Sequence, residues 1–341
     1  MTATSARLIH LVGSVPLESP EAVFRLSSQA LGTLIKRLPD GETGQRGTWI
    51  GWQREWFSAQ TALEPAPARE RDYQMFPPLR LRPGHSIDEI QFGALGYADH
   101  AKDSYAVFRR LKGDGAIPSA TRFLVALPTA YAPVYAHTAY DLQPAIYPKY
   151  EARLLDELAA LCAAIPHDQL AVQWDVATEM SNFEGVYPCV LPGGTEFLRA
   201  RLAYLGDCVP AAVELGYHLC YGSMGGKHWM DPKDAGLMTD IANDIARRLT
   251  RTLEFLHMPV PRDRTDDAFF APLAGLRLKP ETEFYLGLVH NEDGIAGTQQ
   301  RARAAAKFRP GFGIAAECGF GRRAPATIPA LLRLHAEAAR A

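Results

Sequence analysis

The sequence has few cysteines, no long hydrophobic run and no excess of charge of either sign. Its five cysteines are an odd number scattered over 341 residues, so we expect no disulfide framework and a reducing, cytoplasmic location. No segment approaches the roughly 18 consecutive apolar residues of a membrane-spanning helix, and the first residues lack a signal-peptide pattern, which favours a soluble protein with no membrane partner. Thirty-six Lys and Arg against 38 Asp and Glu give no basic surface for nucleic acid.

Two common nucleotide-binding motifs are also missing. No G-x-G-x-x-G follows the first predicted strand, and there is no P-loop, which disfavours a dinucleotide-binding doubly wound sheet, the main alternative fold. No repeat of fixed period is present. The 47% of hydrophobic residues is nevertheless enough for a sizeable buried core, which excludes disorder.

Short apolar runs alternate with longer segments of helical period, as in βα units. Eight runs read as strands: Arg7–Val12, Thr33–Leu38, Thr121–Leu127, Leu170–Asp175, Tyr217–Tyr221, Thr252–His257, Glu283–His290 and Gly313–Cys318. Seven segments read as helices: Pro20–Leu31, Ile87–Lys112, Tyr150–Ile165, Thr195–Leu215, Pro232–Leu249, Ile295–Phe308 and Ala326–Ala339. This pattern predicts an α/β fold, a single-domain (β/α)8 TIM barrel over residues 1–341 with enlarged loops. Residues 41–84 form an insert after the second strand, and we expect Leu63–Pro83 within it to be an irregular loop.

Unusual polar residues gather at the carboxyl ends of these predicted strands. In a barrel such residues converge on the rim that carries active sites, so an enzyme is the economical interpretation. The residues are Ser14, Asp40, Glu42, Arg46, Thr129, Asp175, His218, Cys220, His257, His290 and Cys318.

His218 and Cys220 carry the most specific chemistry. Residues two apart on a strand point to the same side, so one imidazole and one thiolate can reach a single ion, and this ligand pair favours zinc. Cys318, in a glycine-rich turn after the last strand, offers a third ligand. Glu254 or His257 is the predicted fourth; their odd spacing places them on opposite faces of a strand, so at most one binds. The alternative is a packed strand with inert buried cysteines.

These residues resemble the catalytic barrel of cobalamin-independent methionine synthase, in the methionine synthase and uroporphyrinogen decarboxylase-like superfamily. The similarity follows the family order over nearly the whole chain. It rests on Val12-Gly13-Ser14, Pro128-Thr129, Gln173-Trp174-Asp175, His218-Leu219-Cys220-Tyr221, Val289-His290 and Glu317-Cys318-Gly319 with Arg323. The resemblance implies a zinc site, a substrate-amine anchor at Asp175 and an acid–base role for His290.

The chain also departs from the family. Val176-Ala177 replace an E-P pair, nothing corresponds to the separate amino-terminal barrel, and the segment Leu38–Gly44 is foreign to the synthase. These differences put the homocysteine-type amine site and polyglutamyl-folate use in question and predict a remodelled pocket.

The resulting hypothesis is zinc-dependent alkyl (methyl) transfer to a zinc-activated thiol. The substrates are a small-molecule thiol and an alkyl donor, with His290 and Asp175 as catalytic residues. Predicted substrate-binding residues are Ser14, Asp40, Glu42, Thr129, Asp175 and Arg323. The carboxylates of Asp40 and Glu42 could instead satisfy backbone donors of a tight turn.

Other functions stay open at this point. A zinc-dependent lyase that cleaves a C–O or C–C bond without a thiol would use the same site, and a barrel of this ancestry without metal would be a binding protein. A metal-free decarboxylase is less favoured, because the rim has no dense basic cluster. Trp49, Trp52 and Trp56 recur at helical spacing and suggest core or interface packing, so the Trp-rich and Pro-rich inserts could form a homodimer contact.

Overall fold

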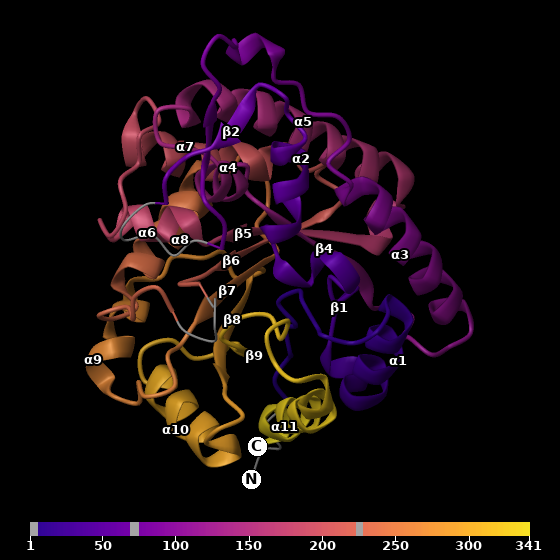
Figure 1. Cartoon of the computed structure of the whole chain (residues 1–341). Helices are drawn as coiled ribbons and strands as arrows, with labels where there is room; N and C mark the ends of the chain where they lie inside the picture. The colour runs from indigo at the N-terminus through magenta and orange to yellow at the C-terminus, as the bar shows by residue number, and fades with distance from the viewer. Residues whose placement is uncertain (1–5, 69–74, 223–227) are drawn as a thin grey trace.

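Seven parallel strands form the central sheet (Figure 1). The computed structural model describes residues 6–68, 75–222 and 228–341. Sheet neighbours follow one another along the chain, as expected of βα units with right-handed crossovers. In sheet order the strands are β1 (Arg37–Pro39), β4 (Arg122–Pro128), β5 (Leu170–Val176), β6 (Glu214–Leu219), β7 (Phe255–Pro259), β8 (Glu283–Val289) and β9 (Gly313–Ala316).

The segment around Ile9 closes this sheet into a barrel. Ile9 forms parallel bridges with Ile35, just before β1, and with Ile314 in β9, so a single residue joins both edges. Its amide donates to the carbonyl of Leu34, and the amide of His10 donates to the carbonyl of Ile314. The predicted (β/α)8 barrel is therefore confirmed, although its first strand is reduced to this bridging segment.

Eleven α-helices surround the strands in the described part of the chain. Helix α1 shows how the sequence sets the ends of one of them: the Ser19 side chain accepts from the amide of Ala22, Pro20 is the first helical residue, and Gly32 ends the helix at φ 54°. The helices are α1 (Pro20–Leu31), α2 (Arg54–Ser58), α3 (Tyr97–Gly113), α4 (Tyr131–His137), α5 (Gln143–Ala164), α6 (Thr178–Phe183), α7 (Gly194–Asp207), α8 (Gly236–Arg248), α9 (Asp267–Phe270), α10 (Gly294–Ala306) and α11 (Ile328–Arg340).

Among the predicted elements that differ from the structure, three have a clear local cause or content. The second strand begins at Arg37 because Gly32–Leu34 form a 3-10 turn. The predicted helix from Ile87 has only a 3-10 turn at Ile87–Glu89 before α3, since Gly96 at φ 91° interrupts the chain. Within Leu63–Pro83, β2 (Leu63–Pro65) and β3 (Leu79–Leu81) pair antiparallel, so the prediction of an irregular loop was wrong there.

A buried cation fills the amino end of the barrel. The Arg37 side chain is only 4% exposed; its Nε donates to Glu214 at 2.5 Å and its Nη1 to Glu283 at 2.7 Å. The guanidinium also lies 4.3 Å from the centre of the Phe255 ring. Burial of this charge is tolerated because both carboxylates and the aromatic face compensate for lost hydration.

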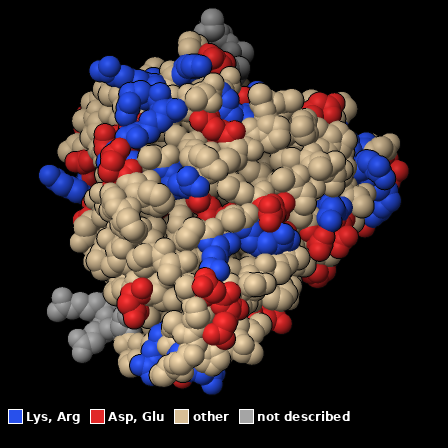
Figure 2. All heavy atoms as spheres, turned by 90° about the horizontal axis from the view of Figure 1, so that it is seen from above, with Lys and Arg blue, Asp and Glu red and all other residues tan. Residues whose placement is uncertain are grey.

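Charges of both signs are mixed on the face that Figure 2 presents, where Lys and Arg are interspersed with Asp and Glu. No helix within the described ranges is sufficiently long and apolar to cross a bilayer.

Candidate functional site

Three side chains from two distant parts of the chain converge at the carboxyl ends of the strands. His218 lies in β6, Cys220 directly follows it, and Cys318 follows β9. One ligand atom from each lies within 4.8 Å of the others, and the two sulfur atoms are 3.7 Å apart. A soft pair of thiols with one imidazole is a donor set that suits zinc.

His218 is oriented for this role by a second histidine. The Nδ1 atoms of His218 and His257 lie 2.7 Å apart, and parallel pairing of β6 with β7 sets the two residues side by side. His218 is 2% exposed, yet its Nε2 has no hydrogen-bond partner among the described residues. A buried ring nitrogen without a partner is costly unless something else binds it. The residues present therefore fit a metal ion bound through Nε2.

The cluster lies against a cavity of about 70 Å³. Its lining includes Ser14, Glu42, Trp49 and Asp175 as well as the three clustered residues. Asp175 receives hydrogen bonds from Nε2 of Gln173 at 2.8 Å and from Nε1 of Trp49 at 3.2 Å. Burial raises the pKa of the Asp175 carboxyl to about 6, although these donors oppose the shift.

Glu42 brings a second carboxyl group to the same cavity. Burial and the nearby Asp175 carboxylate raise the pKa of Glu42 well above its usual range. Its backbone has φ 49°, a left-handed conformation that is strained for a residue with a side chain. Two desolvated carboxyl groups of like charge make this part of the cavity suited to a cationic group of a ligand.

Asp40 holds the loop that presents Glu42. One Asp40 oxygen accepts from the Glu42 amide at 2.9 Å, and the other accepts from Arg46 at 2.7 Å and from the Ser104 hydroxyl at 2.7 Å. Both oxygens are thus engaged within the protein. The structure gives Asp40 a positioning role, where the sequence had predicted a substrate contact.

Ser14 closes the cavity against the turn that carries Cys318. Its carbonyl accepts from the Phe320 amide at 2.6 Å and its hydroxyl from the Gly321 amide at 3.2 Å. A Cβ atom at Gly319 would lie 2.3 Å from Oγ of Ser14, and one at Gly321 would lie 2.8 Å from the same atom. The two glycines therefore allow this turn to approach Ser14.

Replacing Gly319 with alanine should disturb the neighbouring Cys318, which belongs to the cluster that could hold a metal ion. The added methyl group clashes with Ser14, so we expect a loss of about 1–3 kcal/mol in the free energy of unfolding and weaker zinc binding through displaced Cys318. Urea denaturation and competition with a zinc chelator measure the two effects. Gly275→Ala is the matched control, since a Cβ there meets nothing within 4 Å; equal zinc affinity in the two variants would contradict the prediction.

Thr129 contacts a buried carboxyl group and does not line the cavity. Its hydroxyl donates to Oε1 of Glu179, whose Oε2 has no partner among the residues described. Glu179 is 1% exposed, and burial raises its pKa to about 7. The structure thus places Thr129 behind the cavity, where its side chain contacts Glu179.

Glu179 predicts a pH dependence of stability. Its pKa is higher in the folded chain than the ordinary value near 4.5, so between about pH 4.5 and 7 the folded protein holds more protons at this site, and its stability falls as pH rises. Glu179→Gln should therefore change the free energy of unfolding differently at the two ends of this window. Above pH 7 its effect should be about 2–3 kcal/mol more stabilising than at pH 4.5. Denaturation at pH 4.5, 6 and 8 measures the difference. A pH-independent effect of the substitution would show that Glu179 is not responsible.

Three other predicted residues lie away from the cavity. Glu254 precedes β7 at the amino end of the barrel, where it accepts from the Leu215 amide at 2.7 Å and from Arg251 at 3.2 Å. The structure therefore does not bring Glu254 to the cluster; His257 reaches it only through contact with His218. Arg323 pairs with Glu292 at 3.5 Å. Its neighbour Arg322 lines the cavity instead.

His290 lies behind the turn of Cys318. It is 2% exposed, its Nε2 donates to the Val260 carbonyl at 2.9 Å, and its Nδ1 is 3.8 Å from a carboxylate oxygen of Glu317. Burial and the Arg301 guanidinium lower the pKa of His290 to about 4, so the ring is neutral at pH 7. His290 is not among the residues that line the cavity.

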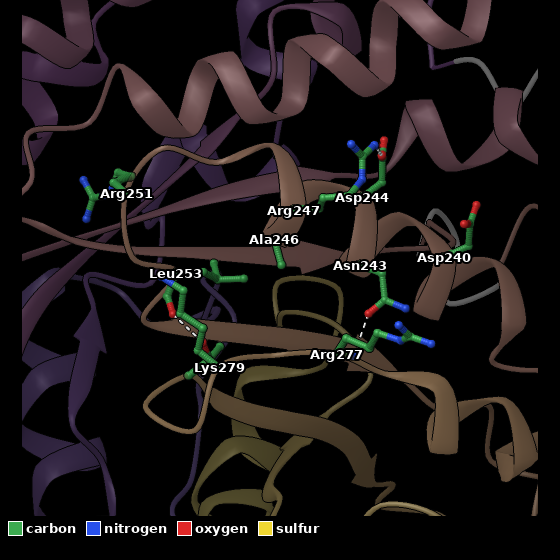
Figure 3. A pocket seen from close by; sticks show the side chains of 10 residues that line it. Asp240, Asn243, Asp244, Ala246, Arg247, Arg251, Leu253, Arg277 and Lys279 are labelled. Atoms are coloured by element: carbon green, nitrogen blue, oxygen red, sulfur yellow. Dashed lines mark hydrogen bonds and ion pairs between the residues drawn. The ribbon is translucent and has the colours of Figure 1, made fainter.

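A larger cavity, of about 440 Å³, lies at the opposite end of the barrel, and Figure 3 shows the side chains that line it. It is lined by Leu253 and Thr282, which precede β7 and β8. Arg251 there donates to four backbone carbonyls, and Arg247 pairs with Asp244. This end of the fold usually serves stability. The cavity on the carboxyl side is the functional candidate.

The comparisons with known proteins agree with this geometry at the level of fold. A B12-independent methionine synthase from Shewanella sp. W3-18-1, in complex with selenomethionine, superposes with a TM-score of 0.60 at 14% identity, over 98% of this chain and 97% of that one. A putative vitamin-B12 independent methionine synthase from Listeria monocytogenes gives 0.52 at 13% identity, over 94% and 86%. A methyltransferase from Methanosarcina mazei gives 0.53 at 12% identity, over 98% and 93%.

The chain shares their barrel fold. No model of a known protein family and no curated protein sequence matches it. The similarity is therefore one of architecture, and the chemistry must be argued from the side chains.

Proposed function

We propose that the protein transfers a methyl or other alkyl group from a small-molecule donor to a thiol, at a zinc ion held by His218, Cys220 and Cys318. The observation that carries this proposal is the unpartnered, buried Nε2 of His218, which converges with two sulfur atoms against a cavity. The folds of two methionine synthases and a methyltransferase support the same reaction class. Zinc bound there would lower the pKa of a substrate thiol, so that it is held as a thiolate at neutral pH.

His218, Cys220 and Cys318 would hold the ion, and the substrate thiol would then supply a further ligand. Glu254 lies at the far end of β7, and His257 contacts His218 with its Nδ1, so neither is needed to complete a tetrahedral site if the thiol supplies the fourth ligand. His257 would then fix the ring of His218, as the outer partners of metal-bound histidines generally do.

Glu42 and Asp175 would bind the ammonium group of an aminothiol. Both carboxyl groups line the cavity that contains the cluster, and Trp49 and Gln173 hold the Asp175 oxygens in place. A bound cation would favour the ionised form of both acids and relieve their mutual repulsion. The reaction then forms an S–C bond, breaks the bond between the alkyl carbon and the donor atom, and passes the thiol proton to the leaving group.

Thiol binding tests this proposal directly. Protein purified without chelator should contain close to one zinc per chain, and the cobalt-substituted form should change its visible spectrum when a thiol coordinates. We expect 2-aminoethanethiol to act at concentrations about 10-fold lower than propanethiol, and Glu42→Gln to remove most of this difference. Formation of the methyl thioether from added donors then measures turnover. Failure to bind or take up zinc would refute the proposal.

The sequence predicts His290 as the acid–base residue, but its ring does not line the cavity and its Nε2 is bonded to the Val260 carbonyl, so its substitution tests whether it takes part in proton transfer. We expect His290→Asn to lower turnover by about 10²–10⁴-fold while zinc content stays unchanged. Metal analysis and single-turnover kinetics measure the two quantities. His335→Asn is the control, because His335 is also buried and bonded to a backbone carbonyl, on α11. Unchanged turnover in His290→Asn would show that His290 has only a structural role. Loss of zinc in this variant would show that His290 is a metal ligand.

A further inference from the structure

A second cavity, of about 100 Å³, adjoins the one that contains His218, Cys220 and Cys318. The two share Trp49, Ala177, Gly222 and Arg322 in their linings, so they lie on either side of a common wall. We call the second cavity the aromatic chamber. Its large apolar lining residues are Trp49, Ile50, Met75, Phe76, Tyr135, Tyr187 and Trp229.

The aromatic chamber coincides with an unusual exposure of apolar side chains. In the described ranges four large apolar residues are exposed, and two of them, Met75 at 44% and Phe76 at 37%, line the chamber. A third, Val186 at 38%, precedes the lining residue Tyr187. Exposed apolar groups that gather around a cavity indicate a surface that a ligand covers.

One buried polar atom in the lining also lacks a partner. His137 is 1% exposed, and its Nε2 donates to the Ile50 carbonyl at 3.0 Å, while its Nδ1 has no hydrogen-bond partner among the described residues. Burial lowers the pKa of His137 to about 4, so the ring is neutral and Nδ1 is an acceptor at pH 7. An acceptor in this state favours a ligand that carries an O–H or N–H group.

The charges of the lining residues also limit which class of ligand the chamber can bind. Arg322 is the one charged residue among the described residues that line the chamber, and the rest are aromatic, aliphatic or small and polar. Aromatic walls favour a flat ring through offset or edge-to-face packing. A ligand with several carboxylates would find few cations here.

We propose that the aromatic chamber binds the uncharged aromatic body of the alkyl donor, with an O–H or N–H group of that body donating to His137. This inference rests on the proposed alkyl transfer and names its donor class. The alkyl group is attached to an oxygen or nitrogen of the ring system. It extends past Trp49 into the cavity that contains His218, Cys220 and Cys318. The C–O or C–N bond of the donor breaks as the S–C bond forms, and the freed oxygen or nitrogen takes the thiol proton, so no oxidant or reductant is needed.

Binding of simple aromatic ethers tests the inference apart from turnover. The probe is 4-methoxyphenol, compared with 1,4-dimethoxybenzene, which lacks the O–H, and with 4-methoxycyclohexanol, which lacks the ring. Ligand-observed NMR titration or calorimetry should give about 10-fold tighter binding for 4-methoxyphenol than for either analogue. Equal affinities, or no binding of the phenol, would overturn the proposal.

Variants locate the binding site and separate the two proposals. Ala136→Trp, which fills the chamber from α4, should abolish binding of the phenol, and Phe76→Ser, at an exposed position, should weaken it several-fold even if the first variant does not fold. Tyr204→Ala, an exposed aromatic residue on α7 that lines neither cavity, should have no effect. Cys318→Ser should retain phenol binding without zinc. Binding unaffected by Ala136→Trp and Phe76→Ser would exclude the chamber, whereas binding with no alkyl transfer would refute only the proposed reaction.

Discussion

Replacing Cys318 with serine should remove bound zinc and abolish alkyl transfer while leaving the far-ultraviolet circular dichroism nearly unchanged. Only three protein ligands converge at the cluster in the described structure, so loss of one thiolate leaves an incomplete site. We expect zinc affinity to fall by at least about 100-fold, because even loss of an outer-shell partner commonly costs 10- to 100-fold. His218→Ala should behave similarly. Metal analysis after dialysis, together with the thioether assay, measures both effects.

Control variants show whether zinc binding and turnover depend on the clustered cysteines or on any cysteine of the protein. Cys189→Ser changes a partly buried cysteine outside the cluster and should keep both zinc and turnover. Full activity in Cys318→Ser with one zinc per chain would remove Cys318 from the metal site. Zinc loss without loss of turnover would instead exclude zinc from the reaction.

Removing the buried cation at the amino end of the barrel should have the largest effect on stability. Arg37→Ala removes the cation that Glu214 and Glu283 share, although Glu214 keeps Arg122 and Glu283 keeps Lys36, and it opens a space beside Phe255. Breaking a buried ion pair from one side typically costs about 3–5 kcal/mol in the free energy of unfolding. Urea denaturation at pH 7 measures the loss, and zinc content should be unaffected because the cluster lies at the other end of the strands.

An exposed arginine provides the comparison. Arg25 pairs with Glu21 at 2.8 Å on the surface of α1 with 51% of its side chain exposed, so Arg25→Ala should leave stability within experimental error. Equally small losses of stability in Arg37→Ala and Arg25→Ala would contradict the prediction. They would mean that water solvates Glu214 and Glu283 in the Arg37 variant, and that these carboxylates do not depend on Arg37.

Local spacing was enough to find part of the site. His218 and Cys220 are two residues apart on a strand, and the period of the strand brings both to one side, so their proximity follows from the sequence. Cys318 follows the last strand of the barrel. Because the carboxyl ends of all strands meet at one end of the barrel, Cys318 lies near His218 and Cys220. Helix α1 was also predicted with its observed bounds, since Ser19, Pro20 and Gly32 fix both ends locally.

The remainder of the site depends on contacts between distant segments. The helical spacing of Trp49, Trp52 and Trp56 suggested packing, yet Trp49 adopts φ 58° and donates to Asp175, 126 positions along the chain. Glu254 seemed a plausible ligand because the predicted strand began at Thr252; the observed strand starts at Phe255, which leaves Glu254 at the wrong end of the barrel. His137 and Arg322 had no sequence signal, because their relevance comes from cavities formed by several loops.

The closure of the barrel near the start of the chain also determines where the two ends lie. The amide of Arg7 donates to the carbonyl of Ala339 at 2.8 Å, so the start of the described chain lies beside the end of α11 (Figure 1). Arg7 precedes the bridging residue Ile9, so this contact lies on the side of the barrel away from His218, Cys220 and Cys318. A short peptide could join the two ends in a circular permutant, and an affinity tag or fusion partner at either end would leave the mouth of the cavity unobstructed.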